Sequence, residues 1–269
     1  MLTISGFSFY QNNRKEEKKM DNDTKLINLA LDAGEIMIQN GAETFRVKDT
    51  MRRILGTTGR ENIEATALVT LLLATLPRED QRPLSMMRAI HSRSVNFQKV
   101  CHVNDMSRAF VEGRITLDEA ACYLEQISHE KEYRLLTRVI FYGLIASCFS
   151  FLSSRSALDG FVAQIIGTLL GFLVHWTNRQ KMPYFLPIFL HGCFVAFMAC
   201  GLHPLFPGTH VDTIIIGGLM PLFPGVTFSK AMRDILEGSI ISGYTKLVEA
   251  VVIAVSLAGG VGMTLSYFI

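Results

Sequence analysis

Long apolar segments fill the second half of this 269-residue chain and restrict its possible folds more than any other feature. A helix needs about 20 consecutive, mostly apolar residues to cross the hydrocarbon core of a bilayer. Runs near this length recur after residue 134, whereas charged residues concentrate before it. Because backbone groups in lipid must be satisfied within the segment, this half predicts a bundle of transmembrane helices.

We expect about five transmembrane helices, the fourth of which is short and broken. Their approximate bounds are 136–154, 159–177, 184–202, 211–225 and 247–268. Cationic residues fall almost entirely in the loops on one side of this arrangement: Arg134, Arg138, Arg179, Lys181, Lys230, Arg233 and Lys246, against Arg155 alone on the other. Since cationic loops stay cytoplasmic, we expect a multi-pass protein of the cell (inner) membrane with its C-terminus outside.

A break rich in proline and glycine interrupts the fourth predicted helix. Pro221, Pro224 and Gly225 stand inside the apolar segment, and each proline removes a backbone donor and disturbs the preceding turn. Irregular backbone at membrane depth persists only where protein buries it or where it lines a wet cavity. Discontinuous helices therefore mark the substrate site of many transporters, and we predict a substrate-binding or gating site at this break. The charged segment that follows predicts a helix lying in the cytoplasmic interface.

Ionisable residues inside the predicted spans are candidates for proton transfer, because burying them in lipid is costly. His191 and Glu249 are two such residues. The alternative for His191 is a structural hydrogen bond to a neighbouring backbone carbonyl. Near the predicted outer end, a metal is conceivable at His203, His210 and Asp212, but their spacing does not require one, and a solvated loop is favoured. We expect no metal and no cofactor.

Residues 24–134 predict a separate cytosolic head of α+β or mostly helical structure. Helical spacing starts near residue 24 and again at Thr44, and a capping box at Thr116 and Glu119 opens a later helix. We expect strands at 63–76 and 84–90 and a further helix at 95–112. Residues 1–23 carry their cations after the apolar patch, the reverse of a signal peptide, and predict a disordered tail.

The head also contains a scattered set of residues that could serve an enzyme: His91, Ser92, His102, Asn104 and Asp105. No hydrolase, metalloprotease or P-loop motif surrounds them, so chance occurrence is favoured and we expect no enzyme. The five cysteines show no paired spacing, which indicates reduced thiols rather than a disulfide framework. No basic stripe with interleaved aromatic residues indicates a nucleic-acid partner.

Three segments resemble, in order, the signature motifs of the ThrE/YjjP-type threonine/serine exporter family. They are GAETFRVKDTMRRI (41–54), FVEGRITLDEA (110–120) and MPLFPGVTFSKAMRDILEGSIISGYTKLVEA (220–250). The resemblance covers about residues 24–269. It implies a proton-driven secondary transporter that exports a small amino acid or a dicarboxylate such as succinate. Long members fuse a second, smaller multi-span unit, so the resemblance also implies a small multi-span membrane partner, within an oligomer.

The residues of this chain that stand at the head motif's positions are Gly41, Glu43, Thr44 and Arg46. Those that stand at the membrane motif's positions are Pro224, Gly225, Arg233, Asp234 and Gly243. The resemblance implies that the prolines and glycines shape the broken helix. Our hypothesis is that Arg233 steers a carboxylate and that Asp234 or Glu249 carries a proton. The alternative for Glu43 and Arg46 is a structural ion pair where the head meets the membrane.

Two other functions compete with export by alternating access around the break. One is a membrane-anchored enzyme, hydrolase-like, or a sensor acting through the head. The other is a non-transporting accessory subunit that stabilises the true carrier. Substrate, coupling ion and stoichiometry do not follow from the residues.

Overall fold

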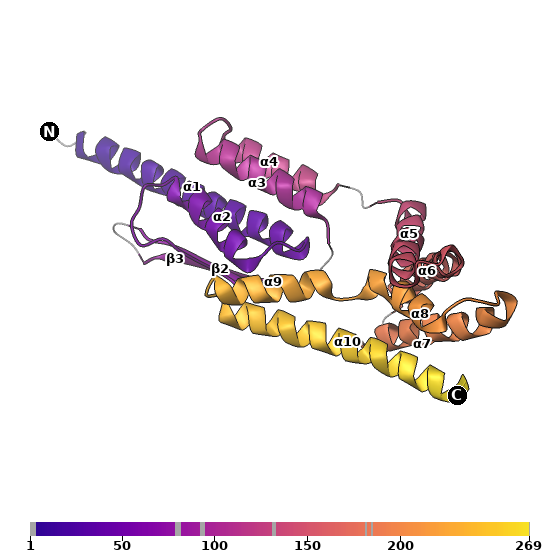
Figure 1. Cartoon of the computed structure of the whole chain (residues 1–269). Coiled ribbons are helices and arrows are strands. Elements are labelled where there is room, and N and C mark those ends of the chain that lie inside the picture. Colours follow the sequence, from indigo (N-terminus) through magenta and orange to yellow (C-terminus); the bar gives the residue numbers. More distant parts are fainter. Residues whose placement is uncertain are drawn as a thin grey trace. The chain divides into compact units, whose positions relative to one another are not determined.

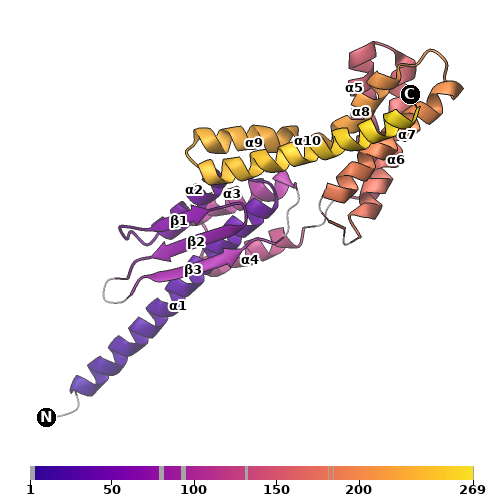
Figure 2. The ribbon, with the colours of Figure 1, turned by 90° about the horizontal axis from the view of Figure 1, so that it is seen from below.

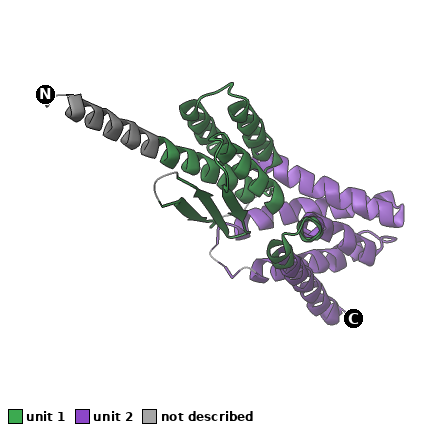
Figure 3. Cartoon of the chain, turned by 90° about the vertical axis from the view of Figure 1, so that its left-hand side faces the viewer, with its two compact units in different colours: residues 1–131, 230–245 green, residues 132–229, 246–269 purple. Residues whose placement is uncertain are grey.

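The computed structural model describes residues 4–78, 82–91, 95–130, 133–180, 182–183 and 185–268, with side chains from residue 22 on. These residues form two compact units (Figure 3). The head unit comprises residues 1–131 and 230–245, and the membrane unit comprises 132–229 and 246–269. The observed division differs in one respect from the division expected at residue 134: residues 230–245 belong to the head unit.

The head unit combines helices with one small sheet (Figure 1). Its elements are α1 (Ile4–Gln39), α2 (Thr44–Gly56), β1 (Glu64–Ala67), β2 (Leu71–Leu76), β3 (Leu84–Ala89), α3 (Phe97–Val111) and α4 (Leu117–Ser128). The predicted capping box at Thr116 and Glu119 is present at the start of α4. Helix α1 begins at Ile4, so its backbone covers most of the segment 1–23 that was expected to be a disordered tail. The first three residues, and the side chains up to residue 21, lie outside the described residues.

The three strands form an antiparallel sheet in the order β1-β2-β3, with α1 and α2 against one face (Figure 2). Leu72, Ala74 and Leu76 alternate with more exposed neighbours along β2 and are buried against these helices. Our prediction of a single strand over 63–76 was wrong. The run folds back on itself between Leu68 and Leu71, whose backbone groups pair across a tight turn. Folding back lets both halves bury alternate residues on one helical layer, β1 against α2 and β2 against α1, which one long strand could not do.

The membrane unit is built from long apolar helices. Its elements are α5 (Leu135–Ser154), α6 (Ala157–Thr177), α7 (Phe185–Leu202), the 3₁₀ turn η1 (His203–Leu205), α8 (Val211–Leu219), the 3₁₀ turn η2 (Met220–Leu222), the start of α9 (Gly225–Leu236) and most of α10 (Ile240–Phe268). Among the described residues, four helices are long and apolar enough to cross a membrane, and α8–η2 with α9 forms a further candidate that is bent by 54°. The prediction of about five spans with one broken is thereby confirmed.

Helix α8 is short and packs against α5, α6 and α7. Its glycines allow very close contact with two of these neighbours. A Cβ atom at Gly217 would lie 2.7 Å from the Ala146 carbonyl oxygen and from Ser150 Cβ on α5, and one at Gly218 would lie 2.8 Å from Val195 on α7. Only glycine fits such an approach of backbone to neighbour. The apolar core of the unit, which includes Ile166 and Ile214, surrounds this helix.

Candidate functional site

The two longest signature segments meet inside the head unit. Helix α2 starts at Thr44, just after a turn in which Gly41 has a φ of 89°, a conformation that favours glycine. The turn is closed by the Ala42 amide, which donates to the Met37 carbonyl oxygen at 2.9 Å. Residues of α9 from Lys230 on contact this turn, and their contacts are the physical reason that 230–245 belong to the head unit.

Asp234 stabilises the start of α2 from a helix that follows 190 residues later. Its side chain is fully buried, and its Oδ1 accepts a hydrogen bond of 3.2 Å from the Thr44 amide. Glu43, the N-cap residue of α2, makes no side-chain capping bond. The first amides of a helix lack intrahelical acceptors and carry partial positive charge. Asp234 therefore acts as a capping group supplied by a distant segment.

Three charged side chains form an ion-pair chain beside this cap. Arg233 Nη1 lies 2.7 Å from Glu43 Oε1, and Arg46 Nε lies 2.9 Å from Glu43 Oε2. The Glu43 side chain is mostly buried, whereas both guanidinium groups are more than half exposed. This geometry is that of the structural ion pair which we weighed as the alternative for Glu43 and Arg46. Roles for Arg233 in steering a carboxylate and for Asp234 in carrying a proton stay predictions.

Two further contacts hold α9 against the head. The Lys230 ammonium group donates to the Gly41 carbonyl oxygen and lies 4.6 Å from the centroid of the Phe97 ring. On the other side of α9, Gly243 lets α10 pack closely, because a Cβ atom there would lie 2.5 Å from Ile235 Cγ1. The motif residues of 220–250 that fall in the head unit are thus placed by packing and hydrogen bonding.

The predicted break is present in the backbone. After η2, which contains Pro221, Phe223 adopts an extended conformation with ψ of 131°, as a residue before proline prefers, and α9 begins at Gly225. Pro224 is buried. Gly225 has room for a side chain, because its nearest neighbour, Phe223 Cδ1, would lie 3.5 Å from an added Cβ atom. Proline chemistry, more than crowding at Gly225, causes the break, and its role in binding or gating stays a prediction.

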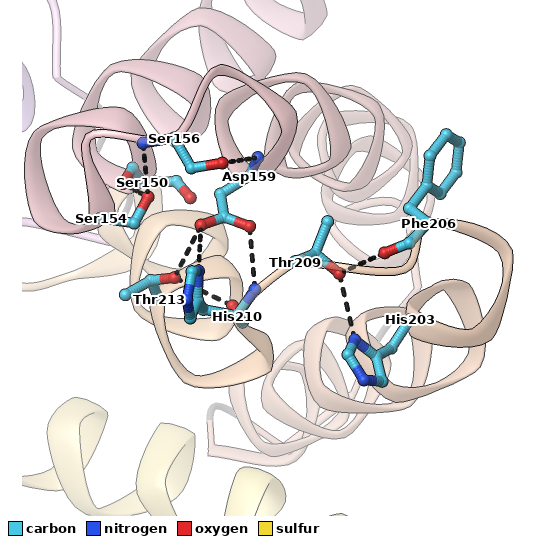
Figure 4. A network of polar contacts seen from close by, with 9 residues as sticks. All are labelled: Ser150, Ser154, Ser156, Asp159, His203, Phe206, Thr209, His210 and Thr213. Carbon is cyan, nitrogen blue, oxygen red and sulfur yellow. Dashed lines mark hydrogen bonds and ion pairs between the residues drawn. The ribbon is translucent and has the colours of Figure 1, made fainter.

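A second buried carboxylate lies in the membrane unit, at the first turn of α6 (Figure 4). Asp159 is fully buried and accepts three hydrogen bonds from the start of α8. Its Oδ1 accepts from the His210 amide at 2.9 Å, and its Oδ2 pairs with His210 Nδ1 at 2.9 Å and accepts from the Thr213 hydroxyl at 3.5 Å. The His210 side chain is 61% exposed, so this pair joins a buried carboxylate to the surface.

The sequence did not reveal this pair. An aspartate in the first turn of a helix reads as an ordinary favourable charge, and Asp159 and His210 are 51 residues apart. The favoured interpretation of 203–212 as a merely solvated loop is corrected at His210, because an ordered ion pair holds its ring. His203 bonds to Thr209, with 3.1 Å between Nδ1 and Oγ1. Within the part of the chain that the structure describes, no three His, Cys, Asp or Glu side chains gather in a way that could hold a metal ion.

The remaining proton candidates have different surroundings. His191 is buried in α7, and its Nε2 lies 3.0 Å from the Thr177 hydroxyl of α6. The alternative interpretation expected a backbone carbonyl as the partner of His191, but the partner is the Thr177 hydroxyl. Glu249 is half-buried in α10. The structure does not test a proton-transfer role for either residue.

The residues weighed for an enzyme do not assemble into a known catalytic set among the described residues. His102 and Asp105 line a groove of about 620 Å³ between α3 and α4, and His102 Nδ1 lies 2.7 Å from Glu130 Oε1. The Asn104 carbonyl oxygen accepts from the Ser107 hydroxyl, and His91 is exposed. Ser92 lies outside the described residues.

These elements define a multi-pass α-helical membrane protein with a broken central helix and an α+β head. A family model described as "Putative threonine/serine exporter" matches residues 28–268, and the chain belongs to this ThrE family. It is 18% identical over 243 residues to a Mycobacterium tuberculosis (strain H37Rv) protein named "Probable threonine/serine exporter". That match covers 90% of this chain and 46% of the relative, so the chain spans about half the length of the relative. No solved structure matches the chain. The family is thus described as one of exporters.

Proposed function

We propose that this chain is an exporter subunit that moves a small amino acid, threonine- or serine-like, or a dicarboxylate such as succinate out of the cell, coupled to protons. The observation that carries the proposal is the bent helix pair, Val211–Leu222 with Gly225–Leu236, whose first part is enclosed by three apolar helices. Broken helices expose unpaired backbone groups that bind small polar solutes in secondary transporters.

The enclosure of α8 supports alternating access around the break. Within the break, the Phe223 and Gly225 amides donate to the carbonyl oxygens of Met220 and Phe223, and the two prolines have no amide to donate. Proline-induced irregular backbone therefore leaves carbonyl oxygens without intrahelical donors, and these suit the ammonium group of a substrate. The start of α9 just after the break suits a carboxylate. We therefore assign substrate contact to the backbone between Pro221 and Gly225 and gating to the bend itself.

We further propose that the protein lies in the inner membrane with the head in the cytoplasm and the C-terminus outside, as the distribution of cations indicates. A second, small multi-span subunit would complete the carrier. The support for it is that the exporter named in Mycobacterium tuberculosis is about twice as long as the matched region.

The test is efflux of radiolabelled threonine, serine and succinate from cells that express the full chain with and without a candidate partner. In the double variant Pro224→Ala with Gly225→Ala, the break loses the proline that directly precedes α9 and the glycine with which α9 begins. Since a proline inside a helix costs about 3 kcal/mol, its removal shifts the equilibrium toward an unbroken helix by up to about a hundredfold. Efflux should fall at least about tenfold at unchanged membrane abundance.

The matched control is Gly262→Ala in α10, where an added Cβ atom meets nothing within 4 Å. Unchanged efflux in the double variant would remove the proposed site. Full efflux from the partner alone, without this chain, would instead assign an accessory role to the chain.

A further inference from the structure

A polar path connects the surface of the membrane unit to a carboxylate buried at the end of α6. The exposed His210 ring and the buried Asp159 carboxylate form this path, with Thr213 as a third member (Figure 4). We propose that the Asp159–His210 pair is the outer proton-exchange site of the carrier, an assignment that rests on the proposed export function and on its proposed orientation.

The hydrogen bonds determine where the proton binds. His210 Nδ1 faces Asp159 Oδ2 at 2.9 Å, so in the neutral ring this nitrogen carries the hydrogen and donates it. The other ring nitrogen, Nε2, then holds the lone pair and accepts a proton from water to give the imidazolium ion. No other covalent bond forms or breaks, and the positive charge is balanced by the buried carboxylate beside it.

The elements around the pair carry three other charged or titratable groups: Asp212, His203 and Arg155. Asp212, in the first turn of α8, adds negative charge near the ring. His203 is bonded to Thr209, and Arg155 is the cation of the turn between α5 and α6. The hydrogen bond to Asp159, followed by the charges of Asp159 and Asp212, raises the pKa of His210 above its ordinary value. The pair is therefore at full strength below the ordinary histidine pKa and weakens as the pH rises through the raised value.

The pair also holds the start of α8. His210 is the N-cap residue of α8, and its carbonyl oxygen accepts from the Ile214 amide at 3.1 Å and from the Thr213 hydroxyl at 2.9 Å. Protonation of His210 thus ties the start of α8 to α6, and loss of the proton loosens that tie. Since α8 leads directly to the break, proton uptake from outside would close the outer end as substrate leaves.

The first test follows the proton itself. The full chain in lipid nanodiscs is labelled with ¹³C-histidine, and the ring signal of His210 is titrated by NMR. We expect the pKa of His210 to lie above its ordinary value, and Asp159→Asn to lower it toward that value. His175→Gln, at the other end of α6, is the matched control and should leave the His210 titration unchanged. Titration at the ordinary value in both the natural chain and Asp159→Asn would overturn the proposal.

The second test follows transport in proteoliposomes with an internal pH dye. In His210→Asn, which keeps a polar side chain, protons taken up per exported substrate should fall at least about twofold and the pH profile of export should flatten. The same proton uptake and pH profile as in the natural chain would overturn the proposal while the export function stands. Absence of export in every chain, with the His210 titration still shifted, would instead overturn the export function and the carrier role of the pair.

Discussion

Among the described side chains, each unit buries one aspartate completely and uses it to hold the start of a helix that is remote in sequence. In the head unit, Asp234 accepts from the Thr44 amide at the start of α2. In the membrane unit, Asp159 accepts from the His210 amide at the start of α8. The neighbours differ: the first aspartate bonds to a backbone amide beside a chain of ion pairs in which arginines hold Glu43, whereas a histidine side chain pairs with the second. Arginine keeps its charge at all physiological pH values, whereas histidine does not.

This difference indicates that one buried aspartate is a permanent clamp and the other is responsive to pH. The chemistry of the partner, rather than the burial of the carboxylate, decides which behaviour results. The following predictions test that comparison.

Removal of the Asp234 carboxylate should produce the largest effect. In Asp234→Ala, the buried Thr44 amide loses its acceptor, and the local free energy of opening of α2 should fall by about 2–3 kcal/mol. Asp234→Asn retains an oxygen acceptor and should lose less. Hydrogen exchange of the α2 amides in the full chain measures the change. Glu237→Ala, an exposed position just after the end of the same helix, is the control and should change the value by less than about 0.5 kcal/mol. Equal effects at the two positions would show that Asp234 does not cap α2.

A change of pH should affect only one of the two helix starts. Between about pH 5.5 and 8.5, hydrogen exchange of the first α8 amides, corrected for the intrinsic rate, should accelerate by about two- to fivefold because His210 loses its proton. The first α2 amides should keep their protection over the same range. His210→Asn should remove the pH dependence at α8. If α2 responded as strongly as α8, the distinction between a permanent and a titratable clamp would be wrong.

The smallest effect concerns how α9 is held against the head. Lys230 lies over the Phe97 ring in addition to its hydrogen bond, and a half-exposed cation–π contact contributes about 0.5 kcal/mol. A double-mutant cycle of Lys230→Met and Phe97→Leu should therefore give a coupling energy of about 0.5 kcal/mol in the opening of α3. A coupling of zero would assign the whole contribution of Lys230 to its bond with the Gly41 carbonyl oxygen.

The sequence revealed the spans because apolar length and helix breakers are local properties. The bounds expected for the first span, 136–154, agree with α5, and proline placed the break. The hairpin inside 63–76 was missed because its turn, at Val69 and Thr70, carries neither Gly nor Pro and continues the apolar run. Turns without those residues leave little trace in the sequence.

The buried aspartates could not be found from periodicity, since their partners are 190 and 51 residues away. The family motifs pointed to Asp234 and to the GAET segment but not to the contact between them. The sequence does not distinguish Asp159 from an ordinary first-turn carboxylate, because its three donors are identified only by the fold.

The contact of α8 with α5 has one more consequence. Gly217, Ala146 and Ser150 meet there with almost no side-chain volume on either helix. Large side chains that interlock must change rotamer before two helices can slide, and this rearrangement contributes an activation barrier. Helices that meet through their smallest residues can shift along each other without it. A helix contact made by small residues therefore lies beside the segment whose displacement export would require.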